Sequence, residues 1–203
     1  MKKILLVVLF LLSISSCVKN EKILFMGDFS SFTISYISNQ KIIDPSFTYE
    51  RMNSNDLYKI VNKDASYVQG DSVYKVSSKV KTSSIVVLSI GIYDFIPCLN
   101  ISIENNLFEV DNEQVEKKKE IFEYNLEHIL EEIHLINSKI KILLISPISF
   151  FDFEIPEQKL FSSFLFDLYL TTINIDEFEY VEIIETFDLV DEKDLCDRIL
   201  EWI

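Results

Sequence analysis

The sequence predicts an α/β domain in which helices cover both faces of a parallel β-sheet. Short apolar runs rich in β-branched residues alternate along the chain with longer amphipathic segments, a pattern typical of βαβ units. The run at 84–91 is apolar on both faces, as a central parallel strand must be. The chain has 203 residues, 48% of them hydrophobic, which suits one folded domain and excludes a disordered protein.

Five segments have the composition of strands, in chain order 23–26, 66–72, 84–91, 139–148 and 180–186. Four segments are predicted to be helical, namely 30–40, 55–61, 112–137 and 159–172. The strongest helical signal is at 112–137, where apolar residues recur every three or four positions between Glu and Lys. Ser54 or Asn55 is expected to cap the second helix, and 41–49, which contains Pro45, is expected to be a loop.

The first sixteen residues have the character of a secretory signal peptide. Lys2 and Lys3 precede an apolar run at 4–12 that is too short to span a bilayer. The segment then ends in Ile-Ser-Ser-Cys at 14–17, which resembles the bacterial lipobox, where the cysteine becomes the lipid-modified first residue. The alternative is an ordinary signal peptide at 1–16 followed by a chance cysteine.

Lipidation of Cys17 would hold the chain on a bacterial membrane, outside the cytoplasm, with 17–21 as a tether and 22–203 as the domain. Removal of the leader takes two lysines with it and changes the formal charge from −14 to −16. A surface of this charge is not attracted to an anionic bilayer, so the acyl chains alone are expected to provide the attachment. The same acidity excludes nucleic acid as a partner, because phosphate binding needs a basic surface.

Short motifs follow three of the predicted strands. Gly27-Asp28 ends the first, Gly70-Asp71-Ser72 ends the second, and Gly91-Ile92-Tyr93-Asp94 follows the central one. Together with the long helix at 112–137 they resemble, in order and spacing, the SGNH/GDSL hydrolases, in particular their extracytoplasmic lipase/acylhydrolase-like branch. The resemblance implies a three-layer α/β/α sandwich with a five-stranded, flavodoxin-like parallel sheet, whose ligands bind at the carboxyl ends of the strands.

The resemblance also implies a catalytic serine, two oxyanion donors and a histidine base, and this chain departs from the family at each position. The serine position holds Phe29, and the donor positions fall at Tyr67 and Tyr93. The terminal Asp-x-x-His is replaced by a segment that keeps only carboxylates, at Asp191 and Asp194. A carboxylate is a weak base at neutral pH. We therefore expect a domain that has lost its esterase activity and that binds a small-molecule or envelope ligand, or serves a structural role.

The degenerate pocket implied by the resemblance consists of Asp28, Phe29, Ser30, Tyr67, Gly70, Tyr93, Asp94, Asp191 and Asp194. Its aspartates are expected to hold loops together rather than to bind a cation, and no metal or cofactor is predicted. Its aromatic rings either pack as core or line a recess for an acyl chain, a sugar or a peptide.

The alternative function is an active serine esterase with a rearranged site. In it, Ser30, one residue after the expected serine position, is the nucleophile. The structural interpretation of Ser30 is a helix cap.

Two histidines, His128 and His134, lie on the long predicted helix. Their spacing of six residues differs from the four-residue spacing of a helical zinc pair. Both are expected to be solvated surface residues.

Two cysteines remain after Cys17 is acylated, and the predicted compartment is oxidising. The family fold brings the loop after the third motif, which contains Cys98, close to the terminal motif beside Cys196. The resemblance therefore leaves two possibilities, a disulfide at the rim of the pocket or two separate buried thiols.

Overall fold

The computed structural model describes residues 22–27, 29, 31–44, 52–69, 72–102, 107–145, 167–171, 177–184, 186, 189 and 191–203. The predicted leader at 1–16, Cys17 and the tether at 17–21 lie outside the described residues, as do Asp28, Ser30 and Gly70. Of the helix predicted at 159–172, only 167–171 is described, and it is helical. Within these ranges, no helix has both the length and the apolar character needed to cross a bilayer.

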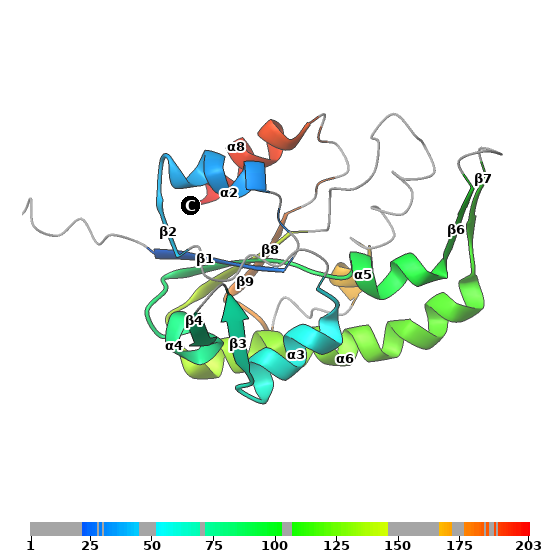
Figure 1. Cartoon of the computed structure of the whole chain (residues 1–203), viewed down its shortest axis with the longest axis horizontal. Helices are drawn as coiled ribbons and strands as arrows, with labels where there is room; N and C mark the ends of the chain where they lie inside the picture. Colours follow the sequence, from blue (N-terminus) through cyan, green and yellow to red (C-terminus); the bar gives the residue numbers. More distant parts are fainter. Residues whose placement is uncertain are drawn as a thin grey trace, which may run out of the picture.

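A parallel sheet runs through the middle of the domain (Figure 1). It has five strands in the order β2-β1-β5-β8-β9, and each neighbouring pair is parallel. The strands are β1 (Lys22–Gly27), β2 (Ile42–Asp44), β5 (Ile85–Ser89), β8 (Lys141–Ile145) and β9 (Val181–Ile184). The prediction of an α/β domain with a parallel sheet is confirmed.

One predicted strand is not part of this sheet. The segment at 66–72 contains β3 (Ser66–Gln69), which pairs antiparallel with β4 (Ser72–Lys75) in a separate two-stranded sheet. Gly and Asp, the residue types between these two strands, are typical of a two-residue hairpin connection. The edge of the main sheet is instead formed by β2, in a segment predicted to be a loop. With three residues and one neighbouring strand, β2 is too short to give a periodic signal.

Helices lie on both faces of the sheet (Figure 1). One face is covered by α2 (Ser31–Ser38) and α8 (Glu192–Trp202), and the other by α3 (Ser54–Asn62), α4 (Val76–Val80) and α6 (Asn112–Ile136). The long helix predicted at 112–137 is therefore confirmed as α6, whereas α8 was not among the predicted helices. The cap of α3 is Asn53, whose side chain accepts the backbone N–H of Asp56 at 2.9 Å, rather than Ser54 or Asn55.

Alternate residues of β1 belong to the two separate cores. Ile23 and Phe25 pack with the core under α2 and α8, and Leu24 and Met26 pack with the core under α3, α4 and α6. All four are at most 1% exposed. Successive side chains of a strand point to opposite faces, so a strand covered on both faces needs the continuous apolar run that the sequence contains.

The segment after β5 leads to α6 through α5 (Ile92–Phe95), the short helix η2 (Ile96–Cys98) and a hairpin of β6 (Leu99–Ser102) with β7 (Leu107–Val110). This hairpin stands away from the main sheet, beyond α5 (Figure 1). The connection therefore leaves the carboxyl end of β5 before α6 returns along the sheet.

The carboxyl end of β1 admits no side chain. Gly27 has a φ of +97°, and a Cβ at this position would lie 1.8 Å from the carbonyl oxygen of Ser89. Gly27 pairs with Ser89 at the end of β5. Both the backbone conformation, which L-residues rarely adopt, and the close approach of β5 therefore require glycine here.

The Gly27→Ala variant is expected to lose roughly 3–5 kcal/mol of unfolding free energy. The positive φ alone costs about 1–2 kcal/mol for a residue with a Cβ, and the contact with a sheet carbonyl forces a shift of β1 against β5. Urea denaturation measures the loss. Ser35→Ala, on the exposed side of α2, is the control and should stay within about 0.5 kcal/mol of the parent. An unchanged unfolding midpoint for Gly27→Ala would contradict the close approach.

Candidate functional site

The carboxyl ends of β1 and β5 lie next to each other and carry the first and third motifs. Gly27 ends β1 beside Ser89, and Gly91, with a φ of 115°, precedes α5. The chain leaves β1 toward α2 on one face of the sheet and leaves β5 toward α6 on the other. In open α/β sheets, ligands bind where consecutive connections diverge in this way. This edge is therefore the candidate site.

Phe29, at the expected serine position, is a core residue. It is 7% exposed and belongs to the core between the sheet and helices α2 and α8. Its ring meets the ring of Phe25 edge to face, with 4.9 Å between centroids and 87° between planes. Of the two interpretations of the aromatic replacements, Phe29 fits packing rather than the lining of a recess.

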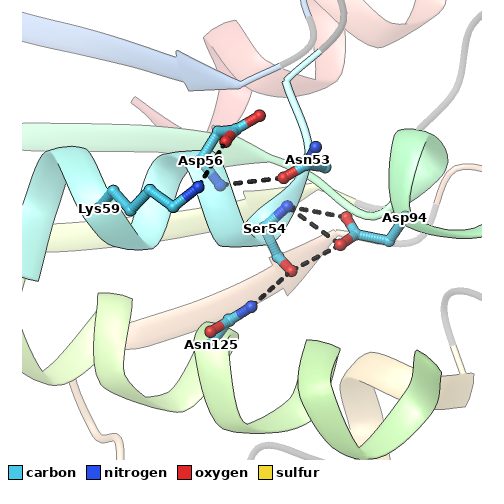
Figure 2. Close-up of polar contacts among 6 residues, drawn as sticks. All are labelled: Asn53, Ser54, Asp56, Lys59, Asp94 and Asn125. Atoms are coloured by element: carbon cyan, nitrogen blue, oxygen red, sulfur yellow. Dashed lines mark hydrogen bonds and ion pairs between the residues drawn. The ribbon is translucent and has the colours of Figure 1, made fainter. Parts of the chain in front are cut away.

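Asp94, from the third motif, binds the beginning of α3 (Figure 2). One carboxylate oxygen accepts the backbone N–H of Ser54 at 2.9 Å, and the other accepts the Ser54 hydroxyl at 2.6 Å. The amide of Asn125 on α6 donates to the Ser54 hydroxyl oxygen at 3.1 Å. The three side chains therefore form a polar cluster that joins α3, α5 and α6.

The contacts of this cluster are structural rather than catalytic. Ser54 is completely buried, so no substrate reaches its hydroxyl, and the hydroxyl proton already lies in a hydrogen bond to Asp94. Burial raises the pKa of the Asp94 carboxyl, while the hydrogen bonds from Ser54 and the charge of Lys118 oppose this shift. The position of the carboxylate at the first turn of α3 also matches the positive end of the helix dipole. Asp94 thus has the loop-holding role expected of it.

The sequence contained one sign of this cluster. Asn125 lies three residues after Phe122 on the apolar stripe of α6, and it is 4% exposed. A polar residue on the buried face of a helix needs a hydrogen-bonding partner. That partner, Ser54, is 71 residues away in the chain, so the pairing itself was not predictable.

A second set of contacts occupies the backbone just before the third motif. The hydroxyl of Tyr169 donates to the carbonyl oxygen of Ile90 and accepts the N–H of the same residue at 3.3 Å. Tyr169 is fully buried and stacks on Phe122 with 6.0 Å between ring centroids. Neither backbone group of Ile90 is therefore available to a ligand.

The two tyrosines at the expected donor positions are not brought together. Tyr93 lies on α5 at the candidate site, half-buried against the core. Tyr67 lies in β3, outside the main sheet. The β3–β4 hairpin contacts α4, toward the opposite end of the domain from α5 (Figure 1). The expectation that Tyr67 stands at the pocket is therefore wrong, because β3 pairs with β4 in a separate two-stranded sheet and is not a strand of the main sheet.

The terminal carboxylates mark the beginning of α8. Asp191 is its N-cap and accepts the backbone N–H of Asp194 at 2.9 Å. In the same turn, Glu192 accepts the hydroxyl of Thr33 on α2 at 2.6 Å. A helix N-terminus favours carboxylates both as caps and through its dipole. Among the residues that the structure describes, no three metal-ligating side chains gather at one point.

The histidines lie on α6 as predicted, and both are partly buried against tyrosines rather than fully solvated. His128 packs on Tyr124 with 4.0 Å between ring centroids, and its Nδ1 lies 2.9 Å from the Tyr124 carbonyl oxygen. His134 stacks on Tyr180 at 3.8 Å. Both rings belong to the face of the sheet opposite Phe29. They are the only histidines of the chain, so no imidazole serves as a base near that position.

The suggested disulfide is also wrong. Cys98 and Cys196 are free, buried thiols, and they lie in the cores on opposite faces of the sheet. Burial raises the pKa of Cys98, and it raises the pKa of Cys196 to about 11. At neutral pH both thiols are protonated, and a thiol in that state is a poor nucleophile.

No protein-family model matches this chain, and no curated protein matches it.

Asp94→Ala is expected to lower the free energy of unfolding by roughly 2–4 kcal/mol, because two donors of the buried Ser54 lose their acceptor. Asp56→Ala is the matched control. Asp56 lies in the same first turn of α3 but forms an exposed ion pair with Lys59 at 3.3 Å, and such pairs contribute about 1 kcal/mol or less. Urea denaturation compares the two variants, and equal losses would contradict the anchoring role of Asp94.

Proposed function

We propose that this chain is a bacterial lipoprotein, anchored outside the cytoplasm through Cys17, whose domain is a degenerate SGNH/GDSL hydrolase-like sandwich that binds a ligand or serves a structural role without hydrolysing esters. The strand order supports the family part of the proposal. Numbered along the chain, the five strands of the main sheet follow the order 2-1-3-4-5, which is the order of flavodoxin-like sheets. The glycine motifs at the ends of β1 and β5 stand where that fold binds its ligands.

The burial of Phe29 is the observation that carries the loss of activity. An ester hydrolase of this plan needs a nucleophile at the tip of the first strand and an imidazole beside it. Here the ring of Phe29 packs against Phe25, and both histidines lie on the other face of the sheet. Loss of one oxyanion donor alone typically costs about 10²–10³ in rate, and loss of a nucleophile or base costs more. Such a domain is a pseudoenzyme.

The polar groups of the candidate site also support the loss of esterase activity. Asp94 is bound to Ser54, Ile90 is bound to Tyr169, and Asp191 caps α8. These three groups are here part of the scaffold. Tyr93, half-buried on α5 at the same edge, suits contact with an acyl chain, a sugar or a peptide better than it suits proton transfer.

The mature chain is expected to show no turnover of a short-chain p-nitrophenyl ester above the level of its Ser30→Ala variant. The control is Ser31→Ala, which changes the neighbouring serine. Turnover that disappears in Ser30→Ala and persists in Ser31→Ala would overturn the proposal and establish the alternative, a serine esterase that uses Ser30.

The anchor has its own test. The chain expressed in bacteria with its leader is expected to enter the detergent phase in a Triton X-114 partition, and Cys17→Ser is expected to remain in the aqueous phase. Cys98 and Cys196 are buried, so acylation at another cysteine does not complicate the comparison. Equal partition of the two chains would contradict lipidation at Cys17.

A further inference from the structure

The lysines of this acidic protein are unevenly distributed over the sheet. At the amino edge, Lys22 begins β1 and Lys141 begins β8. Ser84 lies between them, donating its N–H to the Lys22 carbonyl at 2.9 Å and accepting the N–H of Lys141 at 3.2 Å. Lys41 directly precedes Ile42, which pairs with Lys22.

Two more lysines reach this edge from the connections on the α6 side. Lys81 lies in the connection from α4 to β5, and Lys139 lies in the connection from α6 to β8. Asn137 holds these connections together, because its amide donates to the carbonyls of Val80 and Ser83 at 3.1 and 2.9 Å. We call Lys22, Lys41, Lys81, Lys139 and Lys141 the basic edge.

The lysines of the basic edge have no carboxylate within ion-pair distance among the described residues. None of the five forms an ion pair with an acidic residue in the described part of the chain, and all but the half-buried Lys41 are exposed. Away from this edge, five lysines each pair with a carboxylate: Lys59, Lys75, Lys117, Lys119 and Lys193. The basic edge therefore keeps its charge available for an external anion.

Carboxylates also lie around the basic edge. Glu177 and Glu179 lie on the β9 side, and Glu201 lies at the end of α8. Glu131 on α6 lies near Tyr180, and Asp64, which is ion-paired with Lys75, lies near enough to Lys81 for their charges to interact. Over the amino ends of β2, β1, β5 and β8 the five lysines themselves are not ion-paired with any described carboxylate, although the formal charge of the whole chain is −14.

The short tether brings the basic edge to the membrane. Four residues lie between Cys17 and Lys22, and the five Cα–Cα steps from one to the other span at most about 18 Å. Since β1 begins at Lys22, the amino end of β1 lies within that distance of Cys17, and the amino ends of β2 and β5 lie next to it. The carboxyl ends lie a strand length farther away.

We propose that the basic edge lies on the bilayer and binds the phosphates of anionic lipid headgroups, so that the candidate site at the carboxyl edge faces away from the membrane. The proposal rests on the lipid anchor proposed above and adds the orientation of the domain. The acyl chains hold the protein on the bilayer, and the lysines fix which side of it meets the lipid. Each lysine near an anionic surface strengthens the association about fivefold at low salt, within a Debye length of about 10 Å.

The orientation is tested on the mature lipidated chain in vesicles of phosphatidylcholine, with or without phosphatidylglycerol. A fluorophore is placed on Ser138→Cys, at the amino edge, or on Glu116→Cys, twenty helical residues before the end of α6 and about 30 Å away. Both positions are exposed, whereas the native thiols of the domain are buried. With nitroxide-headgroup lipid present, we expect strong quenching of the fluorophore at 138 and weak quenching at 116. The difference between the two, called the contrast below, is expected to be larger when phosphatidylglycerol is present.

The triple variant Lys41→Gln, Lys81→Gln, Lys139→Gln is expected to lose this contrast while remaining on the vesicles. The matched control, Lys117→Gln, Lys119→Gln, Lys193→Gln, removes the same charge from the first half of α6 and the beginning of α8, away from the basic edge, and should keep the contrast. Equal quenching at 138 and 116, the same contrast with and without phosphatidylglycerol, or an unaffected triple variant would overturn the proposal.

A second measurement separates this proposal from the anchor. The unlipidated Cys17→Ser chain is sedimented with phosphatidylglycerol-containing vesicles at low salt, and the triple variant is expected to bind on the order of 100-fold more weakly. If Cys17 is not lipidated, the parent chain does not bind the vesicles of pure phosphatidylcholine in the quenching experiment. The sedimentation experiment does not depend on lipidation and still tests the basic edge. Equal sedimentation of the parent, triple and control chains would refute the basic edge whatever the outcome for Cys17.

Discussion

The close approach of β1 to β5 is the constraint on which the arrangement of this domain depends. Gly27 lies so near the carbonyl of Ser89 that no side chain fits between the strands. The pairing fixes the point at which the chain leaves each strand, toward α2 on one face and toward α5 and α6 on the other. The direction of Phe29 into one core, and the position of Asp94 beside the other, both follow from this divergence.

At the same edge, polar side chains hold the fold together. Buried polar groups must be hydrogen-bonded, and Asp94 meets this need for Ser54, as Tyr169 does for the backbone of Ile90. A group engaged in this way cannot be redirected to a substrate without leaving its partner unsatisfied, which costs about 1–3 kcal/mol. Stability and catalysis therefore compete at this edge, and the contacts favour stability.

The sequence was sufficient where the signal is local and insufficient where it depends on distant partners. The apolar runs of β1 and β5 and the period of α6 identify their elements, because both faces of each strand and one face of the helix are buried. The edge strand β2 has too few residues for a pattern, and the segment 66–72 has strand composition whether it joins the sheet or a hairpin. Likewise, no local feature reveals that His134 stacks on Tyr180 or that Cys98 and Cys196 lie on opposite faces.

Net charge is a property of composition, whereas attachment to a membrane depends on where the charges lie. A formal charge of −14 favours repulsion from an anionic bilayer only if the acidic side chains face it, since charges farther than a Debye length are screened. Parallel strands place all their amino ends at one edge, and here that edge begins with Lys22 and Lys141. In the orientation proposed above, Tyr93 at the carboxyl edge faces the envelope space, and we expect a ligand at that edge to arrive from there rather than from the leaflet that would hold the protein.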